Sequence, residues 1–427
     1  MKKIVLSLAG VLAATAFAPE ASAIPAFARQ TGLACSSCHY QHFPVLSTTG
    51  QEFKVGAYTQ LSAKGKFKGE DLSIPDTLNA AILLKARYQK SGGTDTAGTV
   101  SGTTTNSGQW QIPDELSLFF GGRIADNGTI KIGFMNENNM AAAPMVAGLK
   151  VPVVIALDPV NVMVIPYGTD ALGVAYGFEQ SSTGMTRGVR WAEHRSDISA
   201  AQYTGIGSGL ASGIAYVVSN EMGYINFSKW SPEFFYLGGS TGVQMSSTWV
   251  RLAATPTIAD WAMHIGVGKV SGTSWVGGGA SQIKTEGTVV DFQGQGALGE
   301  METSVYAQYA TAPASTGAIA NQFNSKTGTA KKAITVGADF SVIPHTLHVG
   351  AAYRIANTGV NAGSTAGDKD NSLTVTAVYD LFQNVALHAN YSMRSGSSYD
   401  TTGTNAAATA VNGNGKTLLT MMLEAAW

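Results

Sequence analysis

The sequence predicts an all-β membrane protein, a transmembrane antiparallel β-barrel of about 16 strands, preceded by a short, mainly helical or irregular N-terminal segment. Charged residues make up only 13% of the 427 residues, against roughly 25% in soluble globular chains, and Gly occurs 50 times. Beyond the N-terminus no apolar run approaches the ~18 residues of a membrane helix. Apolar and polar residues instead alternate over stretches of about ten residues, which is typical of strands between lipid and a lumen. A secreted soluble β-solenoid or sandwich is the alternative.

Residues 1–23 have the pattern of a secretory signal peptide. Lys2 and Lys3 form a basic start, an apolar run follows from Ile4 to Phe17, and residues 21–23 are small, as cleavage requires. The apolar run is too short to span a bilayer. We therefore expect export, with a mature chain that begins near Ile24. The net charge of the whole chain is only −1, so nucleic acid is not an expected partner.

Both cysteines of the chain lie in Cys35-Ser36-Ser37-Cys38-His39. This C-x-x-C-H spacing is the attachment pattern of c-type haem, because two thiols three positions apart reach the vinyl groups on one porphyrin edge and the adjacent imidazole ligates the iron. A redox dithiol would need a βαβ context, a zinc site would need further ligands, and a structural disulfide would leave His39 unexplained. We predict one haem c, attached to Cys35 and Cys38 with His39 as the proximal iron ligand.

The predicted haem segment, residues 24–70, is short. A chain of that size buries too little surface to be stable alone, even with a covalent haem. We therefore expect it to pack against a second surface, which the lumen of the barrel formed by residues 75–427 would provide.

The barrel region shows a regular order of connections. Short turns at residues 126–128, 255–257, 343–345 and 381–383 alternate with long Gly-, Ser-, Thr- and Asn-rich segments at 91–109, 311–330, 357–370 and 395–415. Short turns at one end and long loops at the other are typical of bacterial outer-membrane barrels, whose short turns face the periplasm. Counting back from the terminal aromatic Trp427 gives about sixteen strands, and residues 139–200 are the hardest to divide. We expect contact with outer-membrane lipid, and the pattern predicts no particular oligomeric state.

Residues 25–32, the C-x-x-C-H motif, Pro44, Phe53-Lys54 and Tyr58 resemble the N-terminus of the fused outer-membrane monohaem cytochrome–porins of iron-oxidising bacteria. The resemblance covers roughly residues 24–58, and the barrel matches only in length and pattern. It implies an oxidoreductase that takes electrons from extracellular Fe(II) and passes them through the haem to a periplasmic cytochrome or other soluble acceptor. The chain departs from the expected aromatic-Gly-Arg at residues 49–51, so Arg29 or Lys54 is the expected partner of a haem propionate.

The sequence leaves the sixth ligand of the haem iron open. His264, His348 and His388 each fall in the lumen phase of a predicted strand, a few residues from a short turn, and Met135 falls in a lumen phase as well. Each could reach a haem that lies low in the lumen. The alternative for each is a polar residue of the lumen wall.

Two other functions stay open. The protein could be a diffusion porin whose haem segment is a redox or sensing plug, and the family-like N-terminus speaks against this because a plain porin needs no haem. It could also carry electrons outward to an extracellular acceptor. The sequence does not separate this from iron oxidation, because the direction of flow depends on reduction potentials and partners.

Overall fold

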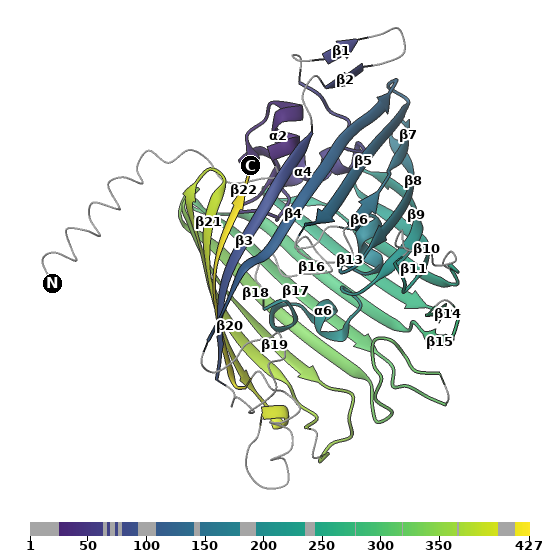
Figure 1. The fold of residues 1–427 in the computed structure, drawn as a ribbon, viewed down its shortest axis with the longest axis vertical. Coiled ribbons are helices and arrows are strands. Elements are labelled where there is room, and N and C mark those ends of the chain that lie inside the picture. The colour runs from purple at the N-terminus through teal and green to yellow at the C-terminus, as the bar shows by residue number, and fades with distance from the viewer. Residues whose placement is uncertain are drawn as a thin grey trace, which may run out of the picture.

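The computed structural model describes residues 25–62, 66–68, 73–75, 79–92, 108–140, 146–179, 194–234, 244–277, 279–317, 319–364, 367–399 and 415–427. In this part of the chain the strands close into one antiparallel barrel (Figure 1). Among the described residues, no helix has the length and apolar character needed to cross a membrane. The predicted signal peptide, residues 1–23, lies outside the described residues.

The closed sheet is built from β3 (Ala80–Ser91), β4 (Gln109–Asp126), β5 (Ile130–Asn139), β6 (Val146–Lys150), β7 (Val153–Leu157), β8 (Val160–Thr169), β9 (Ala211–Asn220), β10 (Gly223–Ser231), β11 (Ser247–Ala254), β12 (Thr257–Ile258), β13 (Trp261–Ser271), β16 (Gly287–Leu298), β17 (Met301–Ala312), β18 (Lys331–Ile343), β19 (Leu347–Asn357), β20 (Asn371–Phe382), β21 (Val385–Ser395) and β22 (Thr417–Ala426). Strands β6 and β7 both pair with β5 and β8, so they form one crossing that is interrupted at residues 151–152. The two-residue β12 belongs to the turn before β13. The barrel therefore has sixteen crossings, and the predicted fold class is confirmed.

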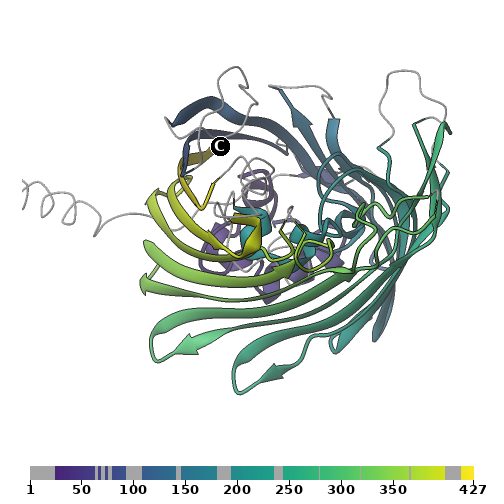
Figure 2. The ribbon, with the colours of Figure 1, turned by 90° about the horizontal axis from the view of Figure 1, so that it is seen from below.

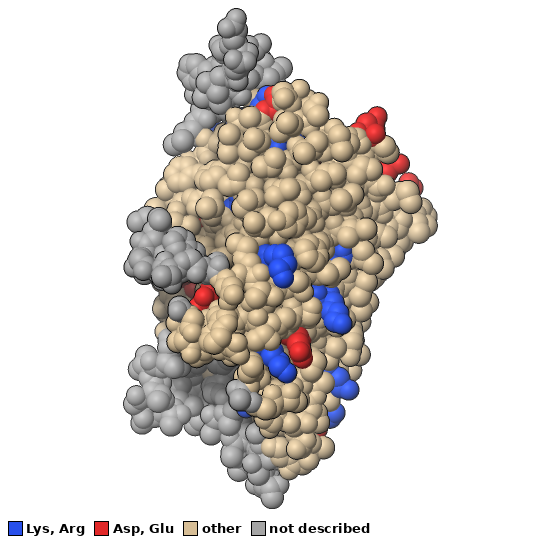
Figure 3. Space-filling model, turned by 90° about the vertical axis from the view of Figure 1, so that its right-hand side faces the viewer, with Lys and Arg blue, Asp and Glu red and all other residues tan. Residues whose placement is uncertain are grey.

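The outer surface of the barrel carries an apolar row. Its members are register partners on successive strands, and each is between 37% and 53% exposed: Ile225, Leu252, Val267, Val290, Tyr309, Ile334 and Ile355. Most of the face in Figure 3 is free of charged side chains. An apolar surface of this extent on a closed barrel is a lipid-facing surface. The chain is a transmembrane β-barrel of the outer-membrane type.

The inner surface carries the polar phase of the same strands. Lys85, Thr335, Asp339 and Arg354 are all buried inside the barrel. His264, His348 and His388 are 7%, 0% and 3% exposed, so their predicted lumen phase agrees with their burial.

The N-terminal segment, residues 25–62, lies inside the end of the barrel that carries the short turns and the C-terminus (Figures 1 and 2). It contains the short helices α2 (Pro25–Thr31), α3 (Cys35–Cys38) and α4 (Thr48–Val55). A two-stranded sheet of β1 (Lys66–Lys68) and β2 (Ser73–Pro75) comes between it and the first barrel strand. A second small sheet, β14 (Thr273–Val276) with β15 (Ser281–Lys284), belongs to a connection at the long-loop end.

A further segment folds into the barrel between β8 and β9. We call the described part of residues 170–210 the lumen segment; it includes the 3-10 turn η2 (Val174–Gly177) and the helices α5 (Arg195–Ile198) and α6 (Ala200–Thr204). Its apolar residues share one buried cluster with inward-facing strand residues, among them Trp230, Trp249, Val270 and Val289. The alternation alone would predict a lumen that is polar throughout. The lumen is instead partly apolar, because these inward positions carry large apolar side chains. The last turn, η3 (Ser397–Tyr399), lies in the connection before β22.

Candidate haem site

One side of the N-terminal segment is fixed to strands β16, β17 and β18. The Tyr40 hydroxyl donates to the carbonyl of Gly296. Gln41 Nε2 donates to the carbonyls of Glu302 at 3.0 Å and Asp339 at 3.2 Å. Residues 40 and 41 therefore sit at a defined place on the barrel wall.

The other side of the segment packs against β3, β4 and β5. The Phe27 ring stacks on Tyr58 with centroids 5.3 Å apart, and Gln30 Nε2 donates to the Tyr58 carbonyl at 2.6 Å. The barrel wall has glycine at positions that the segment approaches very closely. A Cβ on Gly133 would lie 1.7 Å from the Ala57 carbonyl oxygen, and one on Gly121 would lie 2.9 Å from the Phe27 ring. Glycine within a strand often marks such a close approach.

The C-x-x-C-H motif forms a single helical turn and then leaves the helix. The His39 amide donates to the Cys35 carbonyl at 3.0 Å, and His39 then pairs with Leu46 in an isolated bridge. Ser47 ties this loop to α4, because its hydroxyl donates to the Ser37 carbonyl at 2.9 Å and accepts from the Gly50 amide. Gly50 has to be glycine, since a Cβ there would lie 2.1 Å from the Cys38 carbonyl oxygen.

The His39 imidazole is hydrogen-bonded to the backbone through one of its ring nitrogens. Its Nδ1 lies 3.2 Å from the Val45 carbonyl oxygen, which can only accept, so Nδ1 carries the proton. This leaves Nε2 as the nitrogen with a lone pair for a metal. Burial lowers the pKa of His39 to about 4, so the ring is neutral near pH 7.

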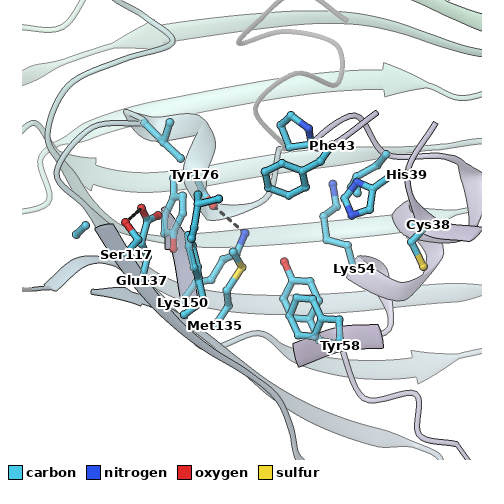
Figure 4. A pocket seen from close by; sticks show the side chains of 18 of the residues that line it. Cys38, His39, Phe43, Lys54, Tyr58, Ser117, Met135, Glu137, Lys150 and Tyr176 are labelled. Carbon is cyan, nitrogen blue, oxygen red and sulfur yellow. Dashed lines mark hydrogen bonds between the residues drawn. The ribbon is translucent and has the colours of Figure 1, made fainter. Parts of the chain in front are cut away.

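A cavity of about 560 Å³ separates the motif from the barrel wall (Figure 4). This volume lies within the roughly 300–1,000 Å³ of small-molecule and cofactor sites. Cys35, Cys38 and His39 line one side. Residues of β3, β4, β5, β6 and β8 line the other, and the start of the lumen segment, from Asp170 to Glu179, lines a third.

The apolar lining of the cavity combines aromatic and aliphatic side chains, and its polar lining carries both signs of charge. Phe27, Phe43, Phe53 and Phe119 are among the aromatic residues. The basic side chains are Lys54, Lys85, Arg87, Lys150 and Arg195, and the acidic ones are Asp114, Glu115, Glu137, Asp170 and Glu179. An enclosure that combines apolar side chains with basic groups fits a porphyrin that carries two propionates. The residues present therefore fit the haem that the motif predicts.

Two lysines lie within this enclosure. Lys54 Nζ is 4.4 Å from the Phe178 ring centroid, and burial lowers the pKa of Lys54 to about 7. Lys150 Nζ is 4.8 Å from the Tyr176 ring centroid and donates to the Tyr176 carbonyl at 3.5 Å.

The structure brings some of the predicted site residues together and separates others. Cys35, Cys38, His39 and Lys54 line the one cavity. Arg29 does not line it and instead donates a hydrogen bond to the Ala80 carbonyl. The wall residues Glu137 and Lys150 were not predicted from the sequence, because alternation does not reveal which strand positions lie beside the motif.

The predicted sixth-ligand histidines lie elsewhere in the lumen. His264 is 3.6 Å from Asp291, His348 is 3.4 Å from Asp380, and His388 is 4.0 Å from Glu424. Within the described part of the chain, none of these histidines lines the cavity beside His39, whereas Met135 does. Among all the residues that the structure describes, there is no cluster of three or more His, Cys, Asp or Glu side chains arranged to hold a metal ion.

Comparison with known proteins finds a likeness in shape only. No protein-family model matches the chain, and no curated protein matches its sequence. A loop-deletion mutant of OmpT from Vibrio cholerae is 14% identical over 82% of this chain and 99% of its own, with a TM-score of 0.46. The channel DcaP of Acinetobacter baumannii is 12% identical over 85% and 100%, with a TM-score of 0.47. The protein opdK of Pseudomonas aeruginosa is 10% identical over 82% and 98%, with a TM-score of 0.41. The barrel assignment rests on the strand pairing described above.

Proposed function

We propose that the protein is an electron conduit of the bacterial outer membrane, which oxidises extracellular Fe(II) and passes the electron through one c-type haem to a soluble periplasmic acceptor such as a cytochrome. One observation supports this above the others. Cys35, Cys38 and His39, whose Nδ1 is bonded to the Val45 carbonyl, line a single cavity inside a transmembrane barrel. A free cytochrome would not need the barrel, and a plain porin would not need the motif.

The proposed orientation follows from the two ends of the barrel. Short turns face the periplasm in outer-membrane barrels. The N-terminal segment then lies on the periplasmic side, within reach of a soluble acceptor, and the long loops face the outside. An electron that starts from Fe(II) has to cross ~30 Å of hydrocarbon thickness, and a redox centre within the lumen divides that distance.

The chain supplies the holding groups for this centre. Cys35 and Cys38 would form the two thioether bonds, and His39 Nε2 would ligate the iron. Lys54, Arg87 and Lys150 would neutralise propionates from around the cavity. A bound haem supplies a one-electron redox centre, so each Fe(II) that becomes Fe(III) gives up one electron and the acceptor gains one.

The contents of the lumen support a conduit over an open diffusion pore. The N-terminal segment lies within the short-turn end, and the lumen segment packs in one apolar cluster with the wall residues Trp230 and Trp249. Asp197 of the lumen segment pairs with Arg394 at 2.7 Å and lies 3.7 Å from Arg354, which holds that segment to β19 and β21.

Carboxylates on the far side of the cavity fit an approach of Fe(II) from outside. Strands β5 and β8 both start at short turns, so Glu137 and Asp170 lie toward the long-loop side of the cavity. Carboxylate oxygen is a suitable ligand for Fe²⁺. The position of these two groups supports an inward path for electrons, from the long-loop side to the N-terminal segment.

The experiment is an anaerobic titration of the purified, haem-loaded protein with Fe(II), followed by haem absorption. We expect a covalent haem stain on a denaturing gel and reduction of the haem by Fe(II). A Cys38→Ala variant should still fold into the membrane, but it should lose the haem stain on the denaturing gel, because stable covalent attachment requires both thioether bonds. Absence of haem from the wild-type protein would overturn the proposal, and haem that Fe(II) leaves oxidised would overturn iron oxidation alone. Adding Fe(III) to the chemically reduced protein tests the opposite direction of flow.

A diffusion porin remains the second candidate, because the closed sixteen-crossing barrel is also the architecture of pores. Conductance in planar bilayers separates the two. We expect the wild-type protein to conduct far less than an open barrel of this size, since two segments occupy its lumen. Large, steady channels in the haem-loaded protein would favour the porin.

A further inference from the structure

The structure places one thioether in the cavity that the C-x-x-C-H motif faces. Met135 lies on β5, in the inward phase that also contains Lys131, Gly133 and Glu137. It is the only methionine among the described residues that line this cavity. Figure 4 shows its side chain at the wall beside Lys150, with His39 on the opposite side of the cavity.

Contacts of the segment with the neighbouring strand positions fix this placement. Met135 pairs in register with Gly121 on β4 and with Lys150 on β6. The Phe27 ring of the segment occupies the space above Gly121, and the Tyr58 ring lies 5.7 Å from Lys150 Nζ. The backbone of Ala57 closes on Gly133, two residues before Met135. The segment that carries His39 therefore contacts the barrel wall at positions on both sides of Met135.

We propose that Met135 Sδ is the sixth ligand of the haem iron, opposite His39. This inference rests on the proposed haem. Cys35, Cys38 and His39 all belong to the N-terminal segment, so they hold one edge and one face of the ring. A second axial ligand would come from the side of the cavity away from the N-terminal segment, and Met135 belongs to the barrel wall on that side.

The other donor side chains of the cavity fit this role less well. Lys85 pairs with Glu115 at 2.7 Å and also lies 3.8 Å from Glu424. Lys54 belongs to the same segment as His39 and points toward Phe178. Lys150 is the nearest competitor, but a lysine must lose its proton before it can ligate iron, whereas a thioether is a ligand at every pH.

A ligand from the wall also gives the barrel a part in tuning the electron transfer. Axial methionine with histidine raises the reduction potential of c-type haem. A higher potential suits a centre that has to accept electrons from Fe(II). The iron would then join the N-terminal segment to β5, so that docking of the segment and the potential of the haem depend on each other.

The test uses the full-length, haem-loaded protein and three variants. Met135→Leu removes the thioether at similar volume, and Met135→His offers a nitrogen ligand at the same place. Met422→Leu is the matched control, because Met422 is also a buried methionine of the wall (2% exposed) but does not line this cavity. The readouts are covalent haem content after denaturation, the near-infrared methionine-to-Fe(III) charge-transfer band, and the reduction potential.

We expect the band in the wild-type and Met422→Leu proteins and its loss in Met135→Leu, with haem content unchanged. The potential of Met135→Leu should fall by at least the 59 mV that corresponds to a tenfold change in a one-electron equilibrium. Met135→His should show a bis-histidine spectrum, which keeps the test decisive if the leucine variant folds poorly. A wild-type protein with haem but without the band, or a band that survives in Met135→Leu, would overturn the ligand assignment and leave the proposed function in place. Absence of haem would overturn the proposed function itself.

Discussion

The contact between Ala57 and Gly133 offers a direct way to move the N-terminal segment while the barrel stays intact. In Gly133→Ala, the new methyl group would lie 1.7 Å from the Ala57 carbonyl oxygen and 2.8 Å from its carbon. Ordinary C···O contacts begin at about 3.3 Å, so segment and wall must separate by roughly 1.6 Å. The strand cannot yield easily, because Gly133 is paired on both sides, with Arg123 in the β4 ladder and with the Pro152 carbonyl at 3.0 Å.

The displacement should spread through the segment. Ala57 is fully buried, and the next residue, Tyr58, carries the stacking with Phe27 and accepts the hydrogen bond of Gln30. Overpacking of this kind costs about 1–3 kcal/mol, and a backbone clash belongs at the upper end. At about 3 kcal/mol the undocked fraction of the segment would rise about 100-fold.

Limited proteolysis of the folded protein measures this fraction. We expect Gly133→Ala to be cut within residues 25–62 about 100 times faster than wild type, while heat-modifiable migration on a gel shows an intact barrel. Gly294→Ala is the matched control, since its Cβ would meet side-chain atoms no closer than 3.3 Å. Equal cleavage rates for Gly133→Ala and wild type would refute the seating of the segment on β5.

Three further changes test other contacts. Gly50→Ala should lower covalent haem content several-fold, because its Cβ would lie 2.1 Å from the Cys38 carbonyl; an unchanged pyridine-haemochrome yield would contradict this. Asp197→Asn removes the carboxylate that pairs with Arg394, which costs about 3 kcal/mol for a buried pair, and should raise channel conductance, while Arg354 keeps its ion pair with Asp370; conductance equal to wild type would count against a lumen segment held by the Asp197–Arg394 pair. Lys54→Met, in a haem-free Cys38→Ala background, should strengthen segment docking more at pH 6 than at pH 9. Burial lowers the pKa of Lys54 to about 7. The free-energy cost of burying this lysine is therefore largest below pH 7, where it is charged, and it decreases as the pH rises toward 10.5, the pKa of the lysine in the undocked segment. The difference should be about 3 kcal/mol in protease protection, and a pH-independent effect would contradict it.

The sequence was sufficient to predict the barrel because its signal repeats along the chain. The alternation recurs on many strands, so errors at single residues do not change the fold class. The phase of the alternation predicted that His264, His348 and His388 face the lumen, and all three are buried. The division of residues 139–200 was harder, because one crossing is split at residues 151–152 into β6 and β7.

Of the residues at the site, the sequence predicted mainly those that are neighbours along the chain. Cys35, Cys38 and His39 are neighbours in the sequence, so their joint role could be read from spacing alone. The wall residues that face them come from five strands, and their height in the barrel depends on strand register, which alternation does not reveal. A usable signal was nevertheless present. Gly121 and Gly133 interrupt otherwise regular strand patterns, and such glycines mark a close approach of another backbone or ring.

The lumen segment was missed for a different reason. Its apolar residues, such as Val174, Tyr176 and Ile206, have the composition of a short strand, and they fold inward only because Trp230 and Trp249 offer apolar partners inside the barrel. Those tryptophans occupy inward positions where the barrel pattern predicts polar residues. An apolar residue in the lumen phase is therefore a signal for lumen packing.

The most direct measurement of electron transfer across the membrane uses sealed proteoliposomes that contain the haem-loaded protein and enclose an oxidised soluble cytochrome. Fe(II), with a chelator that keeps it outside, is added anaerobically, and reduction of the enclosed cytochrome is followed by absorption. We predict reduction with the wild-type protein and its loss with Cys38→Ala. Failure of the wild-type protein to reduce the enclosed cytochrome, or equal reduction through the Cys38→Ala variant, would contradict a conduit that depends on the haem.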